Sequence, residues 1–129
     1  MKNIENLKKA TFLSFLIIFF PGEHVILINL IAILITFLQF LTSIGIDIID
    51  MESVISLILS GFTILSLVFI FNKSKYLSIV SILVQYIWLI YCFNRNNLSS
   101  IYYLISISLF IILSLVLVYF QIKKHKPIN

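Results

Sequence analysis

Apolar residues along this chain gather in long uninterrupted blocks rather than in short alternating patterns. Four stretches contain no charged residue, and they cover 25–46, 53–71, 76–93 and 101–122. Their lengths are 22, 19, 18 and 22 residues, and a helix needs about 17–25 apolar residues to cross a hydrocarbon core of about 30 Å. Because the connections between them are short, we predict one all-α membrane domain over 1–129, an antiparallel four-helix transmembrane bundle.

A shorter apolar run precedes these four stretches. Residues 10–20 form a helix of only roughly 16 Å, about half of a bilayer. We therefore expect 1–20 to be a basic and apolar N-terminal segment that lies at the cytoplasmic boundary and packs against the bundle. A fifth span over 4–20 remains the alternative, because the run is apolar on all sides whereas a surface helix normally has two faces.

The charged residues favour one orientation in the membrane. With four spans and a cytoplasmic N-terminus, eight of the nine basic residues lie inside and only Arg95 lies outside. Five spans abolish this positive-inside bias, since the two sides then carry four and five basic residues. We predict a multi-pass protein of the bacterial inner membrane with both termini in the cytoplasm.

A turn-like tetrapeptide separates the N-terminal run from the first long stretch. It reads Pro21-Gly22-Glu23-His24. Proline suits the first turn of a helix, where its missing N–H has no partner, and a glutamate there faces the positive end of the helix dipole. We therefore expect Pro21 and Glu23 to open the first span at the cytoplasmic face, with His24 as an interfacial residue.

Aromatic residues flank the connection 94–100, which this orientation places outside. Tyrosine and tryptophan concentrate at the boundaries of membranes, where one end of the ring is apolar and the other is wet. We expect an interfacial belt made of Tyr86, Trp88, Tyr91, Tyr102 and Tyr103.

Composition argues against an enzyme. The chain is 61% hydrophobic and 11% charged, with a mean hydropathy of +1.16, whereas soluble domains carry about 25% charged residues. The four stretches hold no ionisable acid or base for chemistry or proton transfer. Glu23 and His24 supply only two of the three or four ligands that a zinc site needs, so we expect no metal and no cofactor. The net charge of +4 follows from orientation and anionic lipid, and we expect no nucleic-acid partner.

Small and polar residues recur at steps of 3 and 4 within the long stretches. Such steps place side chains along one face of a helix in a left-handed bundle, where small residues let backbones approach and amides bond between helices. We expect this face to be a packed interior, with the amides of Asn29, Gln39 and Gln85 as the best candidates for lining a cavity or a partner-binding groove. The candidate residues are Asn29, Thr36, Gln39, Ser56, Ser60, Thr63, Ser81 and Gln85.

These features favour a small polytopic membrane protein that acts by helix–helix interaction. It would serve as an accessory subunit or as an immunity-type protein, and its partners would be the lipid bilayer and a membrane protein or a second copy of itself. A small oligomeric carrier or channel, with the polar face lining its path, is the first alternative. A holin-like pore former is the second.

Overall fold

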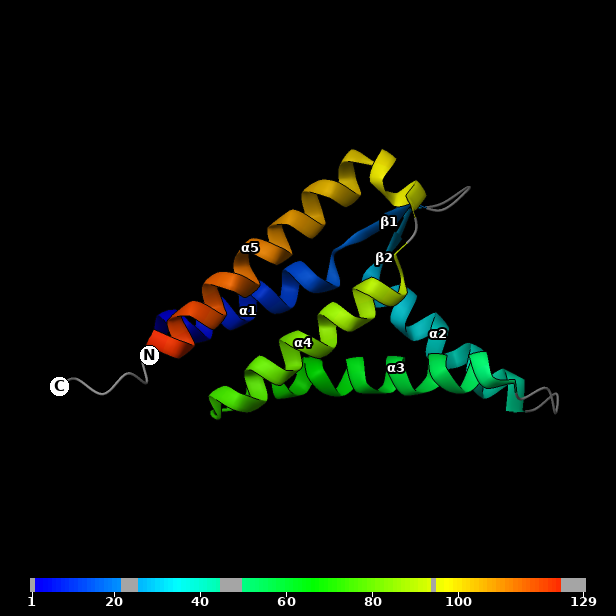
Figure 1. Cartoon of the computed structure of the whole chain (residues 1–129), viewed down its shortest axis with the longest axis horizontal. Coiled ribbons are helices and arrows are strands. Elements are labelled where there is room, and N and C mark those ends of the chain that lie inside the picture. The colour runs from blue at the N-terminus through cyan, green and yellow to red at the C-terminus, as the bar shows by residue number, and fades with distance from the viewer. Residues whose placement is uncertain (1, 22–25, 45–49, 94, 124–129) are drawn as a thin grey trace.

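The computed structural model describes residues 2–21, 26–44, 50–93 and 95–123 (Figure 1). Within these residues the chain is all-α, with five α-helices, one 3-10 helix and one short two-stranded hairpin. The elements are α1 (Lys2–Leu16), β1 (Phe19–Pro21), β2 (Ile26–Ile28), α2 (Asn29–Ile44), α3 (Met51–Phe69), α4 (Lys75–Tyr91), η1 (Arg95–Ser99) and α5 (Ile101–Lys123).

Three of the four predicted apolar stretches are helices to within two residues at each end, namely α3, α4 and α5. By length and composition, α3 with 19 residues and α5 with 23 are long and apolar enough to cross a membrane. The apolar helices α2 and α4 are shorter. The stretch 25–46 differs most from its prediction, because its helix begins only at Asn29 and a strand precedes it.

That strand belongs to an antiparallel hairpin in which Phe19 pairs with Ile28 and Pro21 pairs with Ile26. The backbone N–H of Asn29 extends the pairing by donating to the carbonyl of Ile18 at 2.9 Å. The expectation that Pro21 opens the first span is therefore wrong. Phenylalanine and isoleucine favour strands, and a proline at the end of a short strand removes no ladder hydrogen bond. Glu23 and His24 lie outside the described residues.

The helices form two layers, one of α1 and α5 and the other of α2, α3 and α4 (Figure 1). α1 runs antiparallel to α5, so that the start of α1 lies beside the end of α5. β1 continues along α5 towards its first turn, where the rings of Phe19 and Tyr102 are 6.4 Å apart and those of Phe20 and Tyr103 are 5.7 Å apart. Together, α1 and β1 follow α5 over its whole length.

Two hydrogen bonds join the layers near the chain termini. Lys8 Nζ donates to the carbonyl of Asn72 at 2.7 Å, and Gln121 Nε2 donates to Ser78 Oγ at 2.8 Å. The start of α1, the connection between α3 and α4, and the end of α5 therefore meet at one end of the molecule (Figure 1). Six of the seven described lysines and arginines lie there, and we call it the basic end: Lys2, Lys8, Lys9, Lys73, Lys75 and Lys123.

The opposite end holds β1, β2 and η1, and we call it the hairpin end (Figure 1). The remaining described basic residue, Arg95, lies there in η1. The main core lies between the two ends, where Phe15, Ile18, Ile33, Trp88 and Phe110 are each fully buried. Most of the described positive charge is thus concentrated at one end of an apolar molecule.

Candidate functional site

Asn29 is the most fully bonded of the predicted polar residues. It is completely buried at the start of α2. Its Nδ2 donates to the carbonyl of Phe15 at 2.8 Å, and its Oδ1 accepts from Trp88 Nε1 at 2.9 Å. The side chain therefore ties α1, α2 and α4 together, and both polar atoms of its amide are bonded within the core.

Trp88 was expected in an interfacial belt, and it lies instead in the core at 0% exposure. Its indole needs an acceptor when it is buried, and Asn29 supplies one. The spacing of Trp88 from the polar candidates in the sequence does indicate that it is buried. Trp88 follows Gln85 by three residues and Ser81 by seven, which puts it on the same face of the helix as these candidates.

Buried polar side chains face one another between α3 and α4, and we call this set the polar seam. Each is at most 3% exposed. Its members are Ser60, Thr63 and Ser66 of α3, and Ser78, Ser81 and Gln85 of α4.

Most hydroxyls of the polar seam bond to their own helix. Thr63 Oγ1 donates to the carbonyl of Leu59 and Ser81 Oγ to that of Leu77, each at 2.7 Å. Ser78 is an exception, because its Oγ donates across to the carbonyl of Ile70 at 3.2 Å. The small side chains thus let the two backbones approach closely, while most of their polar atoms are already satisfied.

Gln85 is the chemically unsatisfied member of the polar seam. It is 0% exposed, and neither Oε1 nor Nε2 has a hydrogen-bond partner among the described residues. The 2.6 Å bond between the hydroxyls of Ser56 and Tyr91, together with the bond from Ser78 to Ile70, sets the antiparallel register of α3 and α4. This register puts Gln85 level with Thr63. Each unpaired buried polar group lowers the stability of the fold by about 1–3 kcal/mol. The amide of Gln85 therefore destabilises the interface between α3 and α4.

The other predicted residues line a separate recess between α2 and the start of α3, on the side of the molecule away from the basic end (Figure 1). This recess has a volume of about 180 Å³, and we call it the end hollow. It is lined by Thr36, Gln39, Phe40, Asp50, Glu52, Ser53 and Ser56. Gln39 is exposed here, whereas Gln85 is buried in the polar seam. The two amides that were predicted to share one interior therefore belong to different places.

The end hollow has an acidic rim that the candidate residues did not include. Asp50 caps α3, and its carboxylate accepts a hydrogen bond from the backbone N–H of Ser53 at 2.9 Å. The side-chain and backbone hydrogen bonds with Ser53 hold the pKa of Asp50 below its usual 3.8. Glu52 follows in the first turn, where the helix dipole favours negative charge. The sequence signal for this rim was the acidic connection Asp47 to Glu52.

Within the described ranges, no group of three or more histidine, cysteine, aspartate and glutamate side chains is arranged to hold a metal ion. Comparison of the chain with protein-family models, with curated proteins and with solved structures finds no match. Function therefore has to be argued from the polar seam, the end hollow and the apolar surfaces around them.

Proposed function

We propose that this chain is a small membrane-embedded protein that acts by helix–helix contact with a second membrane protein, as an accessory subunit or an immunity-type protein. The observation that carries the proposal is the surface of α2. Among the described side chains of α2, only those of Asn29 and Ile33 are buried. Six large apolar residues of α2 are exposed: Leu30, Ile31, Leu34, Ile35, Leu38 and Leu41.

Dimensions and surface chemistry support a location in the bilayer. As helices, α3 and α5 measure roughly 28 Å and 34 Å, against a hydrocarbon core of about 30 Å. Their outward faces expose large apolar side chains, for example Phe62, Leu65, Ile105 and Ile112, each at least 50% exposed. Apolar surface on this scale is rare in soluble monomers.

The placement of charge supports an orientation with the basic end in the cytoplasm. If α5 crosses the membrane, the segment formed by α1 and β1 crosses beside it, because it follows α5 over its whole length. From Ala10 to Pro21 this segment spans roughly 25 Å. Lys8 and Lys9 then lie at the cytoplasmic boundary, where lysine side chains extend towards water.

On this account α2 does not cross the bilayer. Its first residue, Asn29, bonds to Trp88, which lies one turn from the end of α4 at the hairpin end. Its later residues Thr36 and Gln39 share the end hollow with the first turns of α3. Both halves of α2 thus lie away from the basic end. The crossings number four, formed by the α1–β1 segment, α3, α4 and α5, and the positive-inside bias is preserved.

The surface of α2 combines two chemistries that suit a helical partner. Its apolar face fits the apolar face of an incoming amphipathic helix. The end hollow beside it offers the amide of Gln39 and the carboxylates of Asp50 and Glu52, which attract basic side chains on the same partner. An immunity-type protein that meets a basic, membrane-active helix from outside needs this combination.

The carrier and pore alternatives receive less support from the polar seam. A conduction path needs polar groups that are free to replace water around the permeant molecule. Most hydroxyls of the seam are already bonded to their own helices, and its side chains are packed between α3 and α4. The unpaired amide of Gln85 is a single site, not a continuous path.

In-cell photo-crosslinking tests the proposal directly. A photoreactive residue at Leu38 of α2 is expected to yield a discrete protein adduct, and Gln39→Leu in the same chain is expected to weaken it. The control position is Leu115 of α5, which is 61% exposed and is expected to yield lipid adducts alone.

Three outcomes decide between the readings. A distinct partner at Leu38 supports the proposal. An adduct with twice the mass of the chain favours the oligomeric carrier or channel instead. Identical lipid adducts at Leu38 and Leu115 overturn the role of α2.

A further inference from the structure

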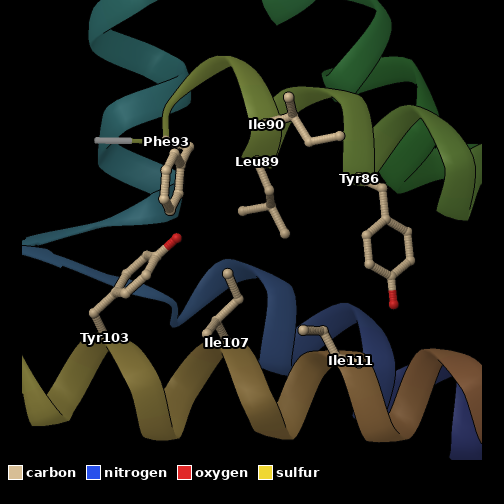
Figure 2. A pocket seen from close by; sticks show the side chains of 7 residues that line it. All are labelled: Tyr86, Leu89, Ile90, Phe93, Tyr103, Ile107 and Ile111. Carbon is tan, nitrogen blue, oxygen red and sulfur yellow. The ribbon is translucent and has the colours of Figure 1, made fainter. Parts of the chain in front are cut away.

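A second surface feature lies between α4 and α5, and no residue of α2 or of the end hollow lines it. It is an apolar groove with a volume of about 240 Å³, larger than the engineered cavity of about 150 Å³ that holds a benzene molecule. Figure 2 shows the side chains of the two helices turned towards each other across this open space. On α4 the groove is lined by Tyr86, Leu89, Ile90 and Phe93, and on α5 by Tyr103, Ile107 and Ile111.

Side chains of α4 and α5 limit the groove at both ends (Figure 2). Near the middle of the molecule, the hydroxyl oxygens of Tyr86 and Ser114 share a 2.5 Å hydrogen bond that links the two helices. The ring of Tyr86 also packs on Phe110, with centroids 5.4 Å apart. Phe93 and Tyr103 mark the other limit, at the hairpin end. An occupant therefore lies along the groove between these two limits, from the hairpin end to the middle of the molecule.

The length of the groove matches one leaflet of a bilayer. From Tyr103 to Ile111, α5 rises roughly 12 Å, and half of a hydrocarbon core is about 15 Å. The groove thus begins near the outer boundary and ends near the midplane. A single acyl chain has the apolar character and the length to lie in it.

A positive charge lies near the hairpin end of the groove. Arg95 follows Phe93 by two residues, so their Cα atoms are at most about 7.6 Å apart. Arg95 is exposed, and it is the only basic residue at the hairpin end among the described residues. Arginine binds phosphate oxygens with two parallel N–H donors, which makes it suited to the phosphate of a lipid.

We propose that the groove between α4 and α5 binds one acyl chain of an anionic phospholipid of the outer leaflet, whose phosphate is held by Arg95. This inference rests on the membrane placement proposed above, but it does not depend on α2 as a docking surface. The bound lipid fills the gap between the two layers of helices and stabilises the angle at which they meet.

Native mass spectrometry of the detergent-purified full chain with added phosphatidylglycerol tests this inference. The wild-type protein is expected to retain one lipid. Ile107→Trp, which fills the groove, is expected to weaken retention by about tenfold or more. Arg95→Gln is expected to weaken it by about five- to tenfold and to remove the preference for phosphatidylglycerol over phosphatidylcholine.

Matched controls separate the groove from general effects on the protein. Leu115→Trp adds the same ring elsewhere on α5, and Lys73→Gln removes a charge at the basic end, and neither change is expected to alter retention. If Ile107→Trp does not fold by circular dichroism, Ile111→Trp at the rim of the groove serves in its place.

The inference fails if the wild-type chain retains no lipid, or if the control variants lose the lipid as strongly as the groove variants do. Photo-crosslinking at Leu38 has a separate readout. Loss of the lipid site is therefore distinguishable from loss of the partner contact.

Discussion

Asn29 and Gln85 carry the same functional group in opposite circumstances. Both are fully buried, but the amide of Asn29 makes two hydrogen bonds while both amide atoms of Gln85 have none among the described residues. A buried hydrogen bond contributes about 0.5–1.5 kcal/mol, and an unpaired buried group costs about 1–3 kcal/mol. Stability should therefore respond with opposite signs at these two positions.

Gln85→Met keeps the length of the side chain and removes the two unpaired atoms. We expect it to raise the free energy of unfolding by about 1–3 kcal/mol. Denaturant titration in micelles, followed by circular dichroism, measures the change. Asn29→Leu is the matched control and is expected to lower stability by about 2 kcal/mol, because it leaves the Trp88 indole without an acceptor. A loss of stability in Gln85→Met would mean that the amide has a partner in the membrane.

The sequence predicted part of this arrangement at the residue scale. Ser60, Thr63, Ser81 and Gln85, which follow steps of 3 and 4 in the sequence, are buried in the structure, because α3 and α4 pack as a regular antiparallel pair. The same steps failed for Gln39. Around Gln39, the residues that line the end hollow come from α2 and the start of α3 alone. The spacing of residues along one helix does not tell how many other helices pack around it.

At the scale of single elements, the hairpin is the main departure from the predicted helices. The apolar residues on either side of Pro21-Gly22-Glu23-His24 form only short runs, Phe19–Phe20 before it and Val25–Ile28 after it. A short apolar run does not distinguish a strand from a helix by periodicity. Long-range bonds decide between them. The N–H of Phe19 donates to Ser106 Oγ at 3.1 Å, and that of Asn29 donates to the carbonyl of Ile18. These partners are distant in the sequence, so the local pattern of residues could not predict the hydrogen bonds.

The start of α3 makes a pH-dependent contribution through Asp50. Its pKa is lowered in the folded chain by the hydrogen bonds with Ser53. Stabilisation is therefore complete above the unfolded value of 3.8 and is lost as the pH falls through the lower folded value. We expect thermal stability to fall between about pH 4 and pH 2 more steeply in the wild type than in Asp50→Asn, which keeps a capping side chain. Equal slopes in the two proteins would show that the cap is not formed.

At the scale of the whole molecule, the two ends differ in charge and in the elements that meet there. The basic end brings together the start of α1, the connection between α3 and α4, and the end of α5, while the hairpin end holds η1, β1 and β2 (Figure 1). The positive-inside count predicted which connections share a side. It does not distinguish the proposed crossing by the α1–β1 segment from a crossing by the stretch 25–46, because both arrangements leave the same basic residues inside.

Cysteine labelling distinguishes these two arrangements through the connection between β1 and β2. In a Cys92→Ser background, single cysteines replace Asn3, Glu23, Asn72 and Leu98, and an impermeant thiol reagent is applied to intact cells and to inverted vesicles. We predict that cysteines at 23 and 98 react in intact cells, and that those at 3 and 72 react in inverted vesicles alone. If the cysteine at 23 reacts together with those at 3 and 72, the α1–β1 segment does not cross the membrane and the proposed topology is wrong.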